Sequence, residues 1–365
     1  MTNIYLEEDE GMIKSPWAWR RLHLWTVMCD LWRNQPTSAS EIARRLGASL
    51  PTISQLLKHL IEGGVVIGAG QKKVRGGRPR NLLRIDPEVA HVLVVDVNAR
   101  SVSTALVNAS LEIVTKRERK GLTRISDIVE SLLKDFEELE LNRRKGKLVG
   151  ISVVLPCASE NSGETDPDVL LNFHSAKLGE LLERRLKTRV IVVNGVKVYT
   201  MGEWLRARHI PWDYFHLHLG RILSGALMLN GHIHEMDEND VAKINRMVYA
   251  MEAGNDHGLI RFEEEYEKAL CAVEAGEKEG KAHLVNLLAV AVTNITALIG
   301  IKHVTLGGPY SKFLELNDMI EIEKRVWETC QEHIATIEKS SSEEEAPFIG
   351  GAVKIFKETL LSIAR

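Results

Sequence analysis

The chain has 365 residues, which is enough for more than one hydrophobic core and fits a small module joined to a larger domain. Its net charge is only -3, yet residues 12–85 hold 13 Lys and Arg against 3 Asp and Glu, which indicates a nucleic-acid partner for the front of the chain. Cys29, Cys157, Cys271 and Cys330 form no C-x-x-C pair, which disfavours a disulfide framework or a thiolate metal site. With no signal-peptide pattern at the start, we expect a cytoplasmic protein.

Three helices are predicted in the front region. Apolar residues three and four positions apart predict a helix over 17–32. Ser38 stands three residues before Glu41, a capping box that begins a short helix over 39–46. Ser49 caps a third helix, 49–60, and Gly63 and Gly64 stop it. The apolar stripe of that helix consists of Ile53, Leu56, Leu57 and Leu60.

A helix, a tight turn and a second capped helix form the pattern with which helix-turn-helix proteins enter the major groove. Gln55 has the amide that can read adenine bidentately, whereas Ser49, Thr52 and Ser54 suit phosphate contacts, and Lys58 adds a cation.

A basic strip over 72–80 follows, and short strands at 65–68 and 82–85 would place it at the tip of a wing. Such a strip alone is equally typical of a solvated linker, and three helices with a hairpin could bind protein. Its position behind the helix-turn-helix pattern favours DNA, so residues 1–86 are predicted to form a winged helix-turn-helix domain. The basic residues expected to contact DNA are Lys72, Lys73, Arg75, Arg78 and Arg80.

Alternating strands and helices after residue 87 predict an α/β domain. The run over 284–301 is apolar but contains Asn and Thr, so it is predicted to be a buried helix and not a membrane span. Strands are expected at 91–97, 101–107, 149–155, 190–193, 215–219, 225–230 and 304–306, and helices at 126–139, 176–186, 263–275, 284–301 and 350–363.

Six short motifs follow one another along the chain. They are Arg-Gly-Gly-Arg-Pro-Arg at 75–80, Asp96 and Asn98 after a strand, the segment 150–156, Val193-Asn194-Gly195, Leu219-Gly220 and Gly307-Gly308. From about residue 18 this order of motifs resembles the ROK (repressor, open reading frame, kinase) family, and its xylose-repressor-like regulators in particular. The resemblance implies an actin-like (ribonuclease H-like), two-lobed sugar-kinase fold over 87–365. The first lobe would span about 87–195 plus the C-terminal helix, and the second about 196–349.

Several positions depart from the kinases of the family. Asn98, Ala99 and Arg100 replace the flexible glycines of the first phosphate loop, and the second loop, 219–224, lacks two glycines. Gly195 stands where the kinases have their catalytic Asp, so the resemblance implies no catalytic residue and no enzyme activity here. The family's zinc-binding cysteines should fall between 232 and 270, where this chain has none, so we expect no metal and no cofactor.

The histidine pairs His216 with His218 and His232 with His234 could form a replacement metal site, but exposed strand histidines are the simpler interpretation.

The positions that match the family's sugar contacts are Cys157, Asn172, Asn194 and Gly195. The two asparagines, with Lys197, are the expected effector-binding residues. The cleft is either retuned for another ligand or has lost its ligand, and both asparagines also fit a capping role at a turn or strand end.

The expected function is therefore a transcriptional repressor of carbohydrate-metabolism genes. It would bind double-stranded operator DNA as a homodimer or homotetramer, respond to a sugar or sugar phosphate, and have no membrane partner. Two alternatives stay open: an ATP-dependent sugar kinase with a DNA-binding domain, and a constitutive DNA-binding protein whose rear domain only dimerises.

Overall fold

A computed structural model describes residues 16–74, 77–98, 101–121, 125–142, 146–155, 175–234, 244–251, 259–330, 336–342 and 344–363. The chain divides into two compact units. Unit 1 comprises Met1–Val153, Ala176–Val192 and Gly351–Arg365, and unit 2 comprises Val154–Ser175 and Val193–Gly350. The winged-helix region shares unit 1 with the sheet that follows it, and the predicted domain boundary at residue 86 stays a prediction.

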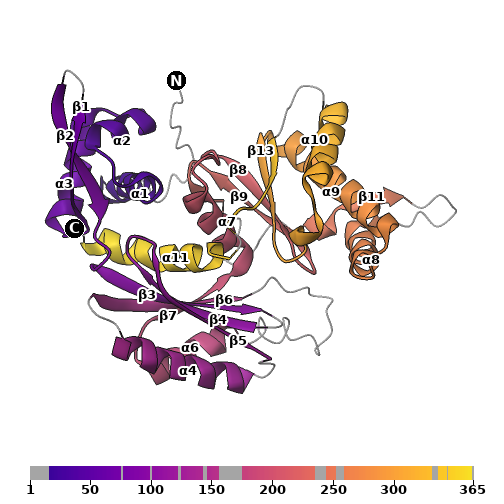
Figure 1. Cartoon of the computed structure of the whole chain (residues 1–365), viewed down its shortest axis with the longest axis horizontal. Coiled ribbons are helices and arrows are strands. Elements are labelled where there is room, and N and C mark those ends of the chain that lie inside the picture. Colours follow the sequence, from indigo (N-terminus) through magenta and orange to yellow (C-terminus); the bar gives the residue numbers. More distant parts are fainter. Residues whose placement is uncertain are drawn as a thin grey trace. The chain divides into compact units, whose positions relative to one another are not determined.

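The front of unit 1 contains the three expected helices and a two-stranded hairpin (Figure 1). Ser38 and Glu41 form both bonds of the predicted capping box, and Gly47 ends α2 with φ of 62°, a left-handed conformation that suits glycine. The elements are α1 (Pro16–Asn34), α2 (Ala39–Leu46), α3 (Leu50–Glu62), β1 (Val66–Val74) and β2 (Gly77–Ile85).

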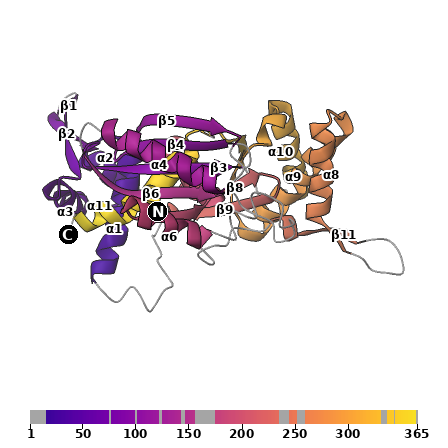
Figure 2. The same cartoon turned by 90° about the horizontal axis from the view of Figure 1, so that it is seen from below.

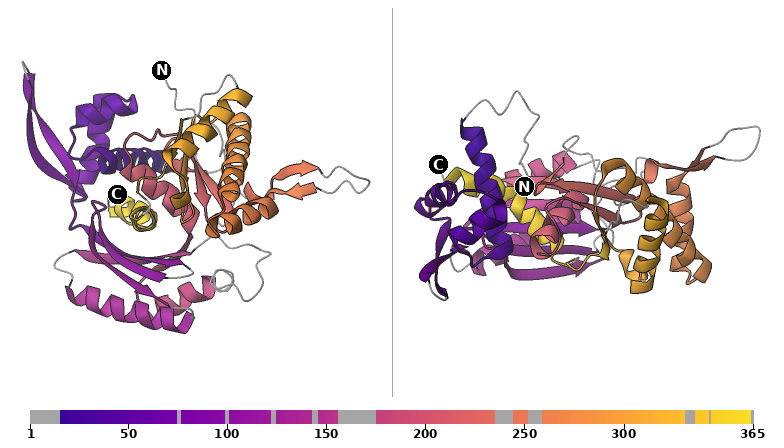
Figure 3. Two further views of the ribbon diagram at one scale, coloured as in Figure 1. Left: turned by 45° about the vertical axis from the view of Figure 1, so that its right-hand side comes forward. Right: turned by 90° about the horizontal axis from the view of Figure 1, so that it is seen from above.

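The wing differs from the prediction because its strands are much longer than 65–68 and 82–85. β1 and β2 pair in antiparallel fashion with Val66 opposite Ile85 and Lys72 opposite Arg80. Most of the basic strip is therefore strand and not loop. The hairpin extends as a narrow ribbon beside the helices (Figure 3).

The rest of unit 1 is a five-stranded sheet in the order β5-β4-β3-β6-β7, whose first three strands form an antiparallel meander. α4 and α6 lie on one face of this sheet and α11 on the other (Figures 1 and 2). The elements are β3 (Ala90–Asn98), β4 (Ser101–Asn108), β5 (Ile113–Lys120), α4 (Ile125–Asn142), β6 (Lys147–Leu155), α6 (Ser175–Leu186), β7 (Val190–Asn194) and α11 (Ala346–Ile363).

Unit 2 is built on a second sheet, in the order β10-β9-β8-β13-β14. β8 and β9 form the predicted antiparallel hairpin, and β13 runs parallel to both β8 and β14. The strands are β8 (Tyr214–Leu219), β9 (Leu223–Leu229), β10 (His232–Ile233), β11 (Val248–Met251), β12 (Leu259–Arg261), β13 (His303–Gly307) and β14 (Thr336–Lys339). The helices are α7 (Gly195–Arg206), η1 (Ile244–Arg246), α8 (Phe262–Glu274), α9 (Lys278–Ile299), η2 (Ser311–Phe313) and α10 (Leu316–Cys330).

The core of unit 2 joins one face of this sheet to α8, α9 and α10. Phe215 and Leu217 of β8 pack in one cluster with Tyr266 of α8, Leu288 of α9 and Ile322 of α10. By length and composition α9 could cross a membrane, but half of its most apolar window is buried inside the protein. This burial fits the expected core helix.

Candidate nucleic-acid interface and sensor site

The apolar stripe of α3 anchors this helix in the winged-helix region. Ile53, Leu56, Leu57 and Leu60 are all at most 9% exposed. The Ser49 side chain accepts a hydrogen bond from the backbone N–H of Thr52 at 3.3 Å, so Ser49 is the helix cap that its sequence position indicates.

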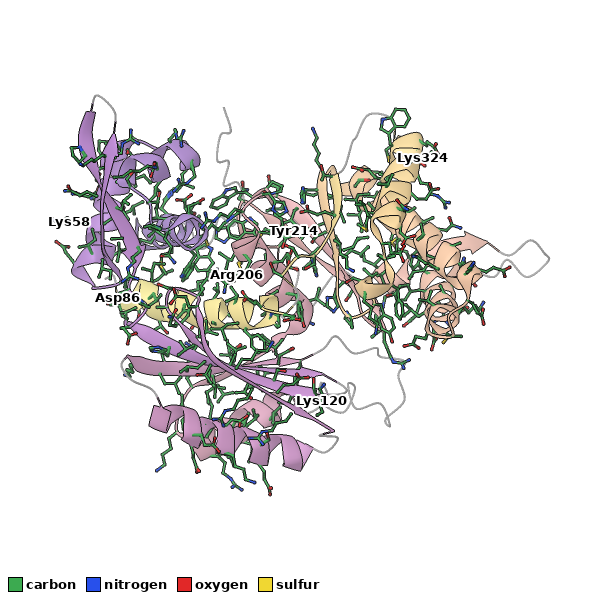
Figure 4. All side chains as sticks on the ribbon, in the orientation of Figure 1. Lys58, Asp86, Lys120, Arg206, Tyr214 and Lys324 are labelled. Atoms are coloured by element: carbon green, nitrogen blue, oxygen red, sulfur yellow. The ribbon has the colours of Figure 1, made fainter. Side chains whose placement is uncertain are left out.

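The residues expected to contact DNA lie on the remaining surface of α3. Ser54, Gln55 and Lys58 are exposed, and Lys58 extends from the helix into solvent (Figure 4). Ser49 and Thr52 are exposed as well, but their hydroxyl oxygens lie 2.7 Å apart in a mutual hydrogen bond. All five predicted residues of this helix are thus accessible to solvent.

An ion pair between the exposed Arg45 and the buried Asp30 holds α2 against α1. The Arg45 guanidinium donates two hydrogen bonds to the Asp30 carboxylate, at 2.8 and 2.6 Å, and a third to the Thr37 hydroxyl at 2.9 Å. Asp30 is 1% exposed, and this bidentate partner offsets the cost of burying its carboxylate. The pair thus fixes the position of α2, the helix that precedes α3.

The basic strip lies along both strands of the hairpin. Lys72 and Lys73 are exposed on β1, and Arg80 is exposed on β2. Arg78 is also in β2, while Arg75 lies outside the described residues.

One acidic side chain of α2 contacts this strip. Glu41 Oε1 lies 3.2 Å from Lys72 Nζ and 4.0 Å from an Arg80 guanidinium nitrogen. Because Lys72 and Arg80 are directly opposite in the hairpin, they would repel each other without this carboxylate. Partial burial raises the pKa of Glu41, but hydrogen bonds from Lys72 and Ser38 outweigh it and hold the pKa at about 2. Glu41 thus ties the wing to the capped end of α2, a contact that the capping-box pattern did not indicate.

The expected effector residues are described only in part. Asn172 and Cys157 lie outside the described residues. The Asn194 side-chain oxygen accepts a hydrogen bond from Val196 N–H at 2.9 Å and caps α7. Lys197 follows in the first turn of α7 and is 8% exposed. Asn194 therefore performs the capping role left open from the sequence, with its amide N–H groups still able to donate.

The backbone around Gly195 explains why glycine stands there. A Cβ atom on Gly195 would lie 2.9 Å from the Leu155 carbonyl oxygen. An aspartate could not occupy this position unless the backbone shifted.

Asp96 lies within the buried stretch of β3 in unit 1. It is 9% exposed, and burial raises its pKa to about 7, although nearby Lys116 lowers it. This carboxyl group therefore changes its charge near neutral pH, where a solvent-exposed aspartate is already ionised.

The expectation that His216 and His218 are exposed strand histidines is wrong. Burial lowers the pKa of His216 to about 3 and that of His218 to about 4, so both rings are neutral. His216 Nδ1 bonds to the Thr305 hydroxyl at 2.9 Å, and the two rings lie 5.8 Å apart beneath Gly307 and Gly308. The sequence pattern missed this because β8 is covered on both faces.

The two histidine pairs do not form a joint metal site. His218 pairs with Ser224 near the start of β9, whereas His232 pairs with Leu229 at the end of that strand. Within the described residues, no group of three or more His, Cys, Asp or Glu side chains could hold a metal ion.

Known proteins match both the winged-helix region and a longer part of the chain. Residues 27–67 match a family model described as winged helix-turn-helix DNA-binding. A xylose repressor of Caldicellulosiruptor bescii is 23% identical over 212 residues, which cover 56% of this chain and 53% of the relative. The chain spans about half the length of the curated relatives it matches.

Solved structures extend the comparison to the whole fold. A ROK family transcriptional regulator, a homolog of the E. coli MLC protein, superimposes with a TM-score of 0.63 at 12% identity, covering 94% of this chain and 98% of that one. A ROK hexokinase from Thermus thermophilus gives a TM-score of 0.58 at 11% identity, covering 74% of this chain and 99% of that one.

The chain is thus a winged helix-turn-helix protein that carries the sugar-kinase-like fold. The resemblance to the xylose-repressor-like regulators of the ROK family, expected from the sequence, is confirmed.

Proposed function

We propose that this protein is a transcriptional repressor of carbohydrate-metabolism genes that binds operator DNA and responds to a sugar or sugar phosphate. The observation that carries the proposal is α3, whose buried stripe leaves Ser54, Gln55 and Lys58 exposed beside a basic hairpin. The xylose repressor among the relatives supports the carbohydrate link.

In this proposal α3 enters the major groove and the hairpin contacts the backbone. Gln55 reads a base edge, and Ser49, Thr52, Ser54 and Lys58 contact phosphates. The wing residues Lys72, Lys73, Arg75, Arg78 and Arg80 bind phosphates and the minor groove.

The proposed effector contacts are Asn172, Asn194 and Lys197. Asn194 supports this role because capping uses only its oxygen, which leaves two amide N–H donors for ligand hydroxyls. Lys197 adds a cation one turn away and would favour an anionic ligand such as a sugar phosphate.

We propose further that the protein is not a kinase. Gly195 supplies no general base, and the close Leu155 carbonyl opposes its replacement. The test is a phosphate-transfer assay with ATP and a panel of sugars, on the wild type and on Gly195→Asp. Neither should phosphorylate any sugar, and turnover by the wild type would restore the kinase interpretation.

We also propose that the protein acts in the cytoplasm as a homodimer or homotetramer. Two copies of the module would read two half-sites of one operator. A second copy is supported by an apolar stripe on α10, where Leu316, Ile320 and Trp327 are 75%, 54% and 53% exposed. Trp327→Lys should shift the sedimentation coefficient toward that of the monomer, and an unchanged value would exclude this surface.

The central experiment is a fluorescence-anisotropy titration with DNA from upstream of the protein's own gene, with and without sugars and sugar phosphates. We expect tight, sequence-selective binding that one compound releases. Tight binding that no compound changes would favour the alternative in which residues 87–365 only dimerise. Binding equal to that of random DNA would contradict the regulator itself.

A further inference from the structure

The first turn of the recognition helix α3 presents an apolar surface. Leu50 is 48% exposed and Pro51 is exposed as well. The two hydroxyls of the same turn, on Ser49 and Thr52, are bonded to each other at 2.7 Å, and Ser49 also caps the helix. The side chains left without polar partners in this turn are thus hydrocarbon.

Helix geometry places this surface next to the expected base contact. Pro51 and Gln55 are four residues apart and share one face of α3, opposite the buried stripe that contains Ile53 and Leu57. Leu50 lies on the adjacent face of the same turn, four residues before the exposed Ser54. In helix-turn-helix proteins the N-terminal residues of the recognition helix are the ones that reach base edges.

We propose that Leu50 and Pro51 determine specificity by contacting the methyl group of a thymine in the major groove. Thymine is the only base whose major-groove edge carries a methyl group, and apolar side chains recognise it. With Gln55 one turn away, the site read by this helix would combine a thymine with a nearby adenine. The inference rests on the proposed DNA-binding function.

The test begins by selecting preferred duplexes from a random double-stranded DNA library with the full-length protein. Each thymine of the selected site is then replaced, one at a time, by deoxyuridine, which removes only the methyl group. Burial of one methyl group corresponds to about four-fold in affinity, so one or two positions should weaken by about that factor.

Three variants assign the effect to the apolar turn. Leu50→Ala should bind thymine and uracil equally at the sensitive position, while Leu50→Met keeps an apolar side chain and should keep the discrimination. Ile61→Ala is the matched control, because Ile61 is 47% exposed on the last turn of the same helix. It should discriminate like the wild type.

The outcomes separate the two proposals. If the library yields no preferred duplex, the DNA-binding function itself fails. If a preferred duplex is found but uracil binds as well as thymine at every position, the methyl contact is overturned. Discrimination that persists in Leu50→Ala overturns the assignment to Leu50. If it also persists when Pro51 is changed to Ala in addition, the assignment to this turn is overturned.

Discussion

The indole N–H of Trp32 donates a hydrogen bond to the carbonyl oxygen of Ala109, 2.7 Å away and 77 positions later in the chain. Trp32 belongs to α1 of the front module, and Ala109 directly follows β4 of the sheet. Two further bonds run beside it: the Gln35 amide donates to the Ser110 carbonyl, and the Ser110 hydroxyl donates to the Ile85 carbonyl. The helices that position α3 are therefore joined to the first sheet by side chains as well as by the linker.

Replacing Trp32 with Phe should weaken this joint. Phe keeps an aromatic ring but leaves the buried Ala109 carbonyl without its donor, which costs about 1–3 kcal/mol. Urea denaturation should show this loss in the free energy of unfolding. DNA affinity without effector should change little, whereas the effect of a ligand on DNA binding should decrease.

Val114→Ala is the control, since Val114 is 53% exposed on β5 and has no part in the proposed sites. Its unfolding free energy should stay within about 0.5 kcal/mol of the wild type. Equal stability losses in the two variants would show that the Trp32 hydrogen bond has no special role.

Glu41→Gln should loosen the contact between the wing and α2. The neutral amide keeps the size of the side chain and can still accept the capping-box bond from Ser38, but it loses the attraction to Lys72 and Arg80. Because the folded pKa is about 2, below the reference value of 4.5, the carboxylate stabilises the fold fully above pH 4.5. Its contribution disappears as pH falls toward 2. Thermal melts should show wild type above the variant at pH 7 and a shrinking difference below pH 4.5, while a constant difference would refute the charge effect.

Wing and recognition helix should respond differently to mutation. Arg78→Ala with Arg80→Ala should weaken binding to all DNA sequences and reduce the slope of log affinity against log salt by about 1 for each phosphate that these arginines neutralise in the wild type. Gln55→Ala should instead relax base preference and leave the slope unchanged. Anisotropy titrations on preferred and random duplexes at several salt concentrations distinguish the two, and identical behaviour of both variants would contradict the assigned roles.

Elements with one buried and one exposed face were predictable from the sequence. A strand rich in charged residues and a helix buried on nearly all sides were not. The stripe of α3 and the capping box of α2 follow from spacing alone, and both are observed. β5 was missed because its residues alternate between intermediate and exposed positions and include Arg117 and Arg119, whose charges pair with the buried Asp135. α7 was missed because nearly all of its residues are buried. Its apolar residues therefore do not recur with the helical period that marks a one-sided helix.

Contacts between distant segments also lay beyond local patterns. Glu41 is recognisable as a capping residue, but its approach to Lys72 requires the length of β1, which the short predicted strand did not have. The burial of His216 depends on Gly307, 91 positions later, whose missing side chain makes room for the imidazole. Such pairs become visible only when the strands are placed in register.

Asp96→Asn should remove the contribution of Asp96 to the pH dependence of the free energy of unfolding. The folded pKa of Asp96 is about 7, above its reference value of 3.8, so between these values the folded state binds more protons than the unfolded state. Stability is therefore lost as pH rises from 4 to 7, by up to about 1.4 kcal/mol per pH unit. Asn resembles the neutral acid in size and never ionises, so the variant should gain on the wild type steadily over this range and stay ahead above pH 7.

The buried histidines do not obscure this comparison. His216 and His218 have lowered pKa values and destabilise the fold as pH falls from 6.5 toward 4, but both are present in wild type and variant and cancel in the difference. Urea unfolding of the wild type and of Asp96→Asn at pH 5, 6, 7 and 8 measures that difference. A difference between Asp96→Asn and wild type that does not change with pH would mean that Asp96 stays ionised in the folded protein, with a partner that stabilises its charge.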